Sequence, residues 1–209
     1  MRRLDLAVAV VVLALVGFAV ARQLASRGEG DTAERPVAIG EALSPDIVLP
    51  VLDGETRRLG DAFGAKATIL YAWSTTCPCI PFCEEKMKAL HARFAPEAGY
   101  AWFAIAGEPT DTAEGIRQEM TSLGSFYPML LDPTHRLCRP LGFDRAAMVA
   151  VLDGDGRLLF RGNLGDDLRH PTKLWLEGAL EAVAAGRAPE PAETALAYGC
   201  TFSPPLAAP

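Results

Sequence analysis

Short apolar runs alternate with amphipathic stretches along most of the chain, which predicts strands alternating with helices. The runs that predict strands are 47–52, 67–73, 100–106, 148–152 and 157–160. Apolar side chains at helical spacing predict a helix over 84–94, with a stripe formed by Cys83, Met87, Leu90 and Phe94. Two further helices are expected at 112–123 and 173–185. This order predicts an α/β fold in which helices flank a mixed central sheet and a hairpin closes the sheet.

The two ends of the chain differ from this middle part. Residues 6–21 are apolar and uncharged and follow Arg2 and Arg3, a pattern typical of a signal anchor or a signal peptide. We favour an anchor, which would place the protein in the cell membrane as a single-pass protein with its domain on the extracytoplasmic (periplasmic) side. Cleavage after Ala21 would instead release it as a secreted or periplasmic protein. The expected divisions are an anchor or signal peptide at 1–21, a linker at 22–36, the folded domain at 37–187 and an irregular Pro-rich tail at 188–209.

Composition narrows the function. The net charge of −6 argues against a nucleic-acid partner, because such proteins usually carry a basic face. Five cysteines in 209 residues are too few for a disulfide-dense miniprotein. Three of the five, however, lie between residues 77 and 83, and an exported cluster of this kind can hold disulfides.

This cysteine cluster lies where a predicted strand leads into a predicted helix. Unpaired backbone N–H groups and the positive end of the helix dipole at such a junction favour a thiolate over a thiol. Either Pro78 or Pro81 suits the first helical position. Cys77 is therefore the candidate nucleophile, Cys79 lies one turn before Cys83, and Cys83 falls on the apolar stripe.

Trp73, Thr75, the Cys77-Pro78 pair and the helix that follows resemble the active-site segment of the thioredoxin superfamily. The match is greatest to exported TlpA-like and AhpC/TSA-type redoxins, and it covers about residues 36–187. Supporting segments are 39–54, 126–133 and 151–162. The resemblance implies a thioredoxin-like fold and thiol–disulfide chemistry, and the candidate auxiliary site residues are Cys83, Trp73, Thr76 and Pro78.

Three departures from the family pattern concern the site itself. The usual Cys-x-x-Cys pair is absent, because Ile80 stands three residues after Cys77. The usual cis-proline before the closing hairpin is replaced by the Ala-Ala-Met run at 146–148. We expect a trans bond there, since a cis bond before a residue other than proline costs about 2.5–4 kcal/mol. Leu70 and Ser74 stand where typical peroxiredoxins carry Pro and Thr, so only a hydroxyl matches.

The partner of Cys77 stays open at this point. A bridge to Cys79 would close a small strained ring, which makes a disulfide more oxidising. Cys200 lies in an aromatic segment of the tail that could fold back over the site, and some redoxins that resemble this chain also end in Gly-Cys. A Cys79–Cys83 bridge is the third pairing. If Cys83 takes no part in the chemistry, we expect it to be a buried apolar residue of the helix. Cys138 is expected to be a buried thiol.

The leading hypothesis is an exported, membrane-tethered thiol–disulfide oxidoreductase that acts through Cys77, with Cys79 or Cys200 resolving the mixed disulfide and no cofactor. Its substrates would be protein thiols or disulfides, small thiols or peroxides. One alternative is a Sco-like copper(I) carrier, in which the soft thiolates of Cys77, Cys79 and Cys83 hold the metal. The other alternative is a thiol peroxidase, an antioxidant activity with Cys77 as the peroxidatic cysteine.

Overall fold

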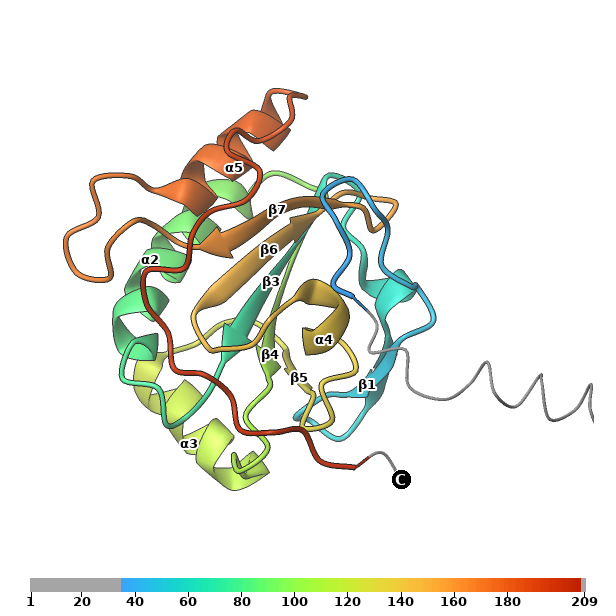
Figure 1. Ribbon diagram of the computed structural model, residues 1–209, viewed down its shortest axis with the longest axis vertical. Coiled ribbons are helices and arrows are strands. Elements are labelled where there is room, and N and C mark those ends of the chain that lie inside the picture. Colours follow the sequence, from blue (N-terminus) through green and yellow to red (C-terminus); the bar gives the residue numbers. More distant parts are fainter. Residues whose placement is uncertain (1–34, 208–209) are drawn as a thin grey trace, which may run out of the picture. The chain divides into compact units, whose positions relative to one another are not determined.

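The computed structural model describes residues 35–207 and contains a five-stranded mixed sheet (Figure 1). The strand order is β5-β4-β3-β6-β7. The strands are β3 (Ala67–Trp73), β4 (Tyr100–Ala106), β5 (Met129–Leu131), β6 (Met148–Leu152) and β7 (Leu158–Asn163). Strand β3 pairs parallel with β4 and antiparallel with β6, so it lies at the centre of the sheet. Every residue of β3 is buried, which explains its unbroken run of apolar and β-branched side chains.

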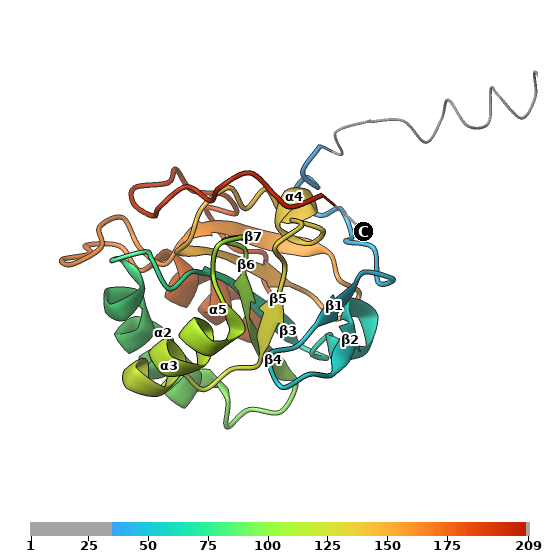
Figure 2. The same cartoon turned by 90° about the horizontal axis from the view of Figure 1, so that it is seen from below.

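Three helices cover one face of the sheet. Helix α2 (Ile80–Phe94) follows β3, α3 (Ala113–Leu123) follows β4, and α5 (Trp175–Ala184) follows β7. Right-handed crossovers between parallel neighbours put α2 and α3 on the same face. Arg93 of α2 forms ion pairs with Glu177 and Glu181 of α5, which brings α5 to that face as well. Figure 2 shows α2, α3 and α5 on one side of the sheet, and α4 and the C-terminal tail on the other.

Smaller elements complete the described part of the chain. Strands β1 (Val48–Pro50) and β2 (Thr56–Arg58) form an antiparallel pair, followed by the 3-10 helix η1 (Leu59–Ala62). The short helix α4 (Cys138–Leu141) is organised by Asp132, a fully buried residue just after β5. The Asp132 carboxylate accepts hydrogen bonds from the backbone N–H groups of Arg136, Leu137 and Cys138 at 2.7, 2.9 and 2.8 Å. These N–H groups precede or begin the helix and would otherwise have no acceptor.

Most predicted elements are present. Strands 67–73, 100–106 and 148–152 have the predicted bounds, and the loop after β6 is the predicted turn, in which Asp153 accepts N–H groups of Asp155 and Arg157. The bond before Met148 is trans, as expected, since Glu190–Pro191 is the cis bond of the described residues. The helix predicted over 84–94 begins earlier, at Ile80, because Cys79 already has helical backbone angles.

The predicted anchor at 6–21 lies outside the described residues, as does nearly all of the predicted linker. Within residues 35–207, no helix has the length and apolar character needed to cross a membrane.

Replacing Asp132 tests its role as acceptor for three buried N–H groups. We expect Asp132→Ala to lower the free energy of unfolding by about 3 kcal/mol, because the N–H groups lose their acceptor without gaining water. The matched control is Asp153→Ala, which removes an acceptor from an exposed turn and should cost less than about 1 kcal/mol. Urea unfolding of both variants measures the difference, and equal losses would contradict the assigned role.

Candidate active site

The candidate site lies at one edge of the sheet, where the parallel strands β3, β4 and β5 all end. The loops that leave these strands begin at Ser74, Gly107 and Asp132. The segment that enters β6, residues 144–147, reaches the same edge because β6 runs antiparallel to β3. The carboxyl ends of parallel strands are where ligand and catalytic groups gather in open α/β sheets.

The loop between β3 and α2 is held by its own hydroxyl groups and by one carboxylate. The Ser74 hydroxyl lies 3.0 Å from that of Thr76 and accepts the Thr76 N–H at 3.2 Å. Asp111, in the loop after β4, accepts the Thr75 N–H at 3.0 Å and the Thr75 hydroxyl. These bonds fix the backbone immediately before Cys77.

Helix α2 begins directly after the cysteine pair. Cys79 is the residue preceding the helix, and Pro81 stands in its first turn, where a missing N–H costs nothing. The Ile80 N–H donates to the Cys77 carbonyl at 3.1 Å, which turns the chain from the loop into the helix. Cys77 is therefore at the start of the helix, as its position in the sequence predicts.

The C-terminal tail reaches this edge as well. We call residues 197–206 the C-terminal strap; it is drawn in red in Figure 1 and crosses the strand ends in the order β7, β6, β3, β4, β5. At the β7 end, the Asn163 side chain accepts the Ala197 N–H at 2.7 Å and donates to the Ala147 carbonyl at 2.9 Å. At the other end, the Leu206 N–H donates to the Pro133 carbonyl at 2.9 Å.

The middle of the strap lies against the segment that enters β6 and against the loop after β4. The Ala146 N–H donates to the Cys200 carbonyl at 3.0 Å. The Phe202 ring is buried beside Gly107, and the Ser203 N–H donates to the Glu108 carboxylate at 2.9 Å. Burial by itself raises the pKa of Glu108, but hydrogen bonds from Ser203 and Thr110 outweigh it and hold this pKa below its ordinary value.

Two thiols of the loop before α2 and one thiol of the strap lie near enough for Cys77 to affect the ionisation of Cys79 and Cys200. Cys77 is only 3 % exposed, whereas Cys79 and Cys200 are half-buried, and all three are free thiols. Burial raises the pKa of Cys200 to about 12, together with a hydrogen bond and charge repulsion from Cys77 and, more weakly, from Cys79. Burial and the same two effects of Cys77 also raise the pKa of Cys79, against the opposing hydrogen bond from the Gly199 N–H.

This coupling determines how the cluster holds charge. Cys77 is a cause of the raised pKa of both Cys79 and Cys200, because a negative charge on one sulfur disfavours a second charge nearby in a partly buried site. Cys79 and Cys200 therefore resist ionisation.

The other two cysteines do not join this cluster. Cys83 is fully buried beside Tyr71, and burial raises its pKa to about 12, so it stays a thiol. Cys138 is also fully buried, and burial together with the neighbouring Asp132 raises its pKa well above the ordinary value. In the part of the chain that the structure describes, no group of three or more His, Cys, Asp or Glu side chains is arranged to hold a metal ion. The copper(I) set of Cys77, Cys79 and Cys83 is thus not favoured.

The predicted auxiliary residues lie in different surroundings. Thr76 and Pro78 are exposed on the loop, on either side of Cys77. Trp73 is fully buried at the end of β3, and its indole Nε1 donates to a carboxylate oxygen of Glu84 at 3.1 Å. Trp73 is therefore a core residue next to the site and is not exposed at the surface of the site.

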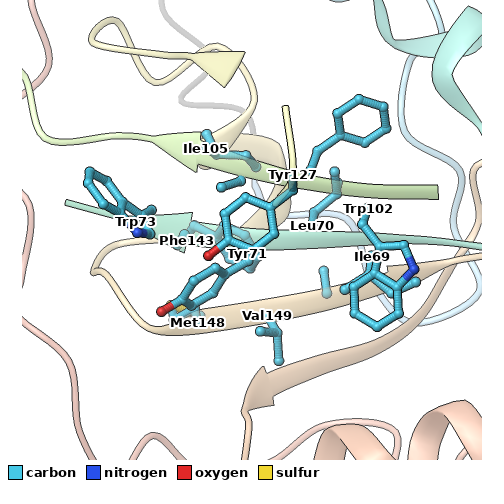
Figure 3. Packing of buried hydrophobic residues seen from close by; sticks show 14 of the residues in the cluster. Ile69, Leu70, Tyr71, Trp73, Trp102, Ile105, Tyr127, Phe143, Met148 and Val149 are labelled. Atoms are coloured by element: carbon cyan, nitrogen blue, oxygen red, sulfur yellow. The ribbon is translucent and has the colours of Figure 1, made fainter. Parts of the chain in front are cut away.

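Glu84 is a site residue that the sequence analysis missed. It is only 1 % exposed and lies beyond the first turn of α2. Its Oε1 accepts from Trp73 and from the hydroxyl of Tyr127, while its Oε2 has no hydrogen-bond partner within residues 35–207. Figure 3 shows Trp73, Tyr71 and Tyr127 in this part of the core. The aromatic side chains around Glu84 come from distant parts of the sequence, so only the fold shows that they surround it.

The mixed sheet, the helices on one face and the thiols at a strand-to-helix junction define a thioredoxin-like redoxin. The model of the AhpC/TSA family matches residues 40–158, and the chain belongs to this family. Family and fold together make the protein an oxidoreductase of the redoxin type. No curated protein matches the sequence.

Solved structures agree on the fold. An uncharacterized conserved protein from Geobacillus kaustophilus is 23 % identical with a TM-score of 0.72, covering 82 % of this chain and 94 % of that one. A hypothetical protein from Sinorhizobium meliloti 1021 is 22 % identical with a TM-score of 0.68, covering 80 % and 95 %. The thioredoxin domain of a thiol-disulfide oxidoreductase from Bacteroides vulgatus is 15 % identical with a TM-score of 0.51, covering 58 % and 86 %.

The buried Glu84 makes a prediction about stability and pH. Burial raises the pKa of Glu84 above its ordinary value, and the hydrogen bond from Trp73 and the charge of Lys88 offset this only in part. A carboxyl group with a raised pKa in the folded state stabilises the protein below its unfolded pKa, and this contribution is lost as the pH rises through the folded pKa. Glu84→Gln should therefore become more stable relative to the natural protein as the pH increases from 4 to 8.

Urea unfolding of both proteins across this pH range measures the effect. Glu85→Gln, at the exposed neighbouring position, is the matched control and should show no such trend. A stability difference for Glu84→Gln that stays constant with pH would contradict a raised pKa at Glu84.

Proposed function

We propose that this redoxin is an exported, membrane-tethered thiol–disulfide oxidoreductase in which Cys77 is the nucleophile. The observation that carries the proposal is the meeting of three thiols, Cys77, Cys79 and Cys200, at the carboxyl edge of the sheet. Two of them come from the start of α2 and the third from the far end of the chain. The apolar segment 6–21 after Arg2 and Arg3 supports export and tethering.

The reaction runs through a mixed disulfide. The Cys77 thiolate attacks one sulfur of a substrate disulfide, the substrate S–S bond breaks, and the departing thiolate takes up a proton. A second protein thiol then loses its proton and attacks the Cys77 sulfur. This step releases the second substrate thiol, so the substrate gains two electrons and the protein becomes a disulfide. The oxidised protein can run the same steps in reverse and oxidise a dithiol.

Cys200 is better placed than Cys79 to resolve the mixed disulfide. A bond from Cys77 to Cys79 would span a single intervening residue and close a strained ring. Cys200 comes from a separate segment and lies near enough to Cys77 for the two to affect each other's charge, so their sulfurs can join without such a ring. Cys79 lies beside both and would exchange with either disulfide.

Family membership supports thiols, disulfides or peroxides as substrates. Disulfides are favoured over peroxides here because Leu70 and Ser74 stand where typical peroxiredoxins carry Pro and Thr. A peroxide would also require a sulfenic acid on Cys77 before Cys79 or Cys200 condenses with it.

Replacing the nucleophile tests the proposal directly. Cys77→Ser should abolish insulin reduction and oxidative refolding, with rates at least about 100-fold below those of the natural protein, since an alcohol cannot form the mixed disulfide. Cys83→Ser is the matched control, because Cys83 is a buried thiol outside the cluster and should keep most of the activity in folded protein. Undiminished activity of Cys77→Ser would end the proposal.

The resolving thiol can be identified by trapping. In Cys200→Ser, the mixed disulfide between Cys77 and substrate should persist and be visible by intact-protein mass spectrometry, because its main route of release is gone. In Cys79→Ser, release should continue, and peptide mapping of the oxidised protein should give a Cys77–Cys200 bridge. Persistence of the adduct in Cys79→Ser rather than Cys200→Ser would assign the resolving role to Cys79.

A further inference from the structure

The C-terminal strap pairs with the domain as an added β-strand does. Arg145 and Thr201 form an antiparallel bridge, with the Ala146 N–H donating to the Cys200 carbonyl and the Phe202 N–H to the Asp144 carbonyl, at 3.0 and 2.9 Å. Side chains alternate as in a strand: Thr201 is exposed, whereas Cys200 is half-buried and Phe202 is buried. Backbone pairing of this kind is how extended peptides are recognised at exposed sheet edges.

The strap pairs with residues 144–146 close to the Cys77 loop. Residues 144–146 lead directly into β6, beside the end of β3 from which the Cys77 loop departs. A peptide paired with this segment in the register of the strap would place a cysteine where Cys200 lies, against Cys77 and Cys79. The strap therefore occupies the backbone groups that would hold a peptide substrate with its sulfur at the nucleophile.

The strap is anchored at several points. Phe202 is buried against Gly107 and within 5.7 Å of the His135 ring, measured between ring centroids, and the Ser203 N–H is bound by Glu108. Close contact also requires glycine at position 199 of the strap. Gly199 has φ +117°, and a Cβ atom there would lie 2.2 Å from the Ala146 carbonyl oxygen. A segment so closely fitted competes effectively with any incoming peptide.

We propose that the strap determines the substrate class of this site: while it is docked, small thiols and disulfides are accepted in preference to peptide substrates. This inference rests on the proposed thiol–disulfide function. A peptide needs the hydrogen-bonding groups of residues 144–146 and must displace the strap to reach them. A small disulfide has no use for those groups and needs only local access to the Cys77 sulfur.

Two probes with the same leaving group separate these cases. One is a synthetic peptide with the sequence of residues 196–206, whose cysteine is linked by a disulfide to 5-thio-2-nitrobenzoate. The other is the corresponding mixed disulfide of cysteamine. Both release the same chromophore on attack by reduced full-length protein, so any difference in their rates reflects the peptide rather than the disulfide chemistry.

Phe202→Ala removes the main anchor of the strap and keeps Cys77, Cys79 and Cys200 in the chain, although Cys200 moves with the strap when it is released. The rate with the peptide probe should rise at least about tenfold, since truncating a buried Phe weakens docking strongly, while the cysteamine rate should change less than about threefold. Leu206→Ala is the matched control: its side chain is 54 % exposed, so both rates should stay unchanged. Hydrogen exchange at the Ser203 amide should show that the strap is released in Phe202→Ala but stays docked in Leu206→Ala.

A second variant guards against a folding defect in the first. Gly199→Ala displaces the strap by collision with Ala146 and should raise the ratio of peptide to cysteamine rates in the same direction. Equal acceleration of both probes would make the strap a simple lid and overturn the proposal, as would no acceleration of either. Failure of the proposed function is distinct, because Cys77→Ser would then still release the chromophore from both probes.

Discussion

Satisfying backbone hydrogen bonds at the carboxyl edge of the sheet is the constraint on which the site depends. Three parallel strands end there, and the loops that follow leave N–H groups without ladder partners. Polar side chains at that edge supply the acceptors: Asp132 for the start of α4, Asp111 for the loop before Cys77, and Glu108 and Asn163 for the C-terminal strap. The same side chains that complete the backbone thus hold the reactive segments in place.

Charge is the second constraint on this edge. Burial and the charge of neighbouring thiols raise the pKa values of Cys79 and Cys200, so these two thiols resist ionisation. The proposed roles of these thiols rest on position rather than on a sequence motif, because Ile80 replaces the usual second cysteine. The third thiol reaches the site through the tail, so the site is assembled from segments far apart in the chain.

The strap contributes both a thiol to the site and contacts with the segment that enters β6. It brings Cys200 near Cys77 and occupies the backbone groups of residues 144–146. Thr201 faces outward, whereas Cys200 and Phe202 face the domain, so these three residues are arranged locally as in a strand. A tail with this much Pro cannot form a regular ladder, and it docks instead through single bonds at separate points.

The sequence by itself determined the elements whose signal is local: strands 67–73, 100–106 and 148–152, the hairpin turn, and Cys77 at a strand-to-helix junction. Their periodicity and turn residues are readable within a short window. Only the tertiary structure decided that Glu84 is buried, that α2 begins at Ile80, and that Cys200 lies at Cys77 rather than in a free tail. Each of these depends on contacts between segments far apart in the chain, and no local pattern records which distant surface will cover a residue.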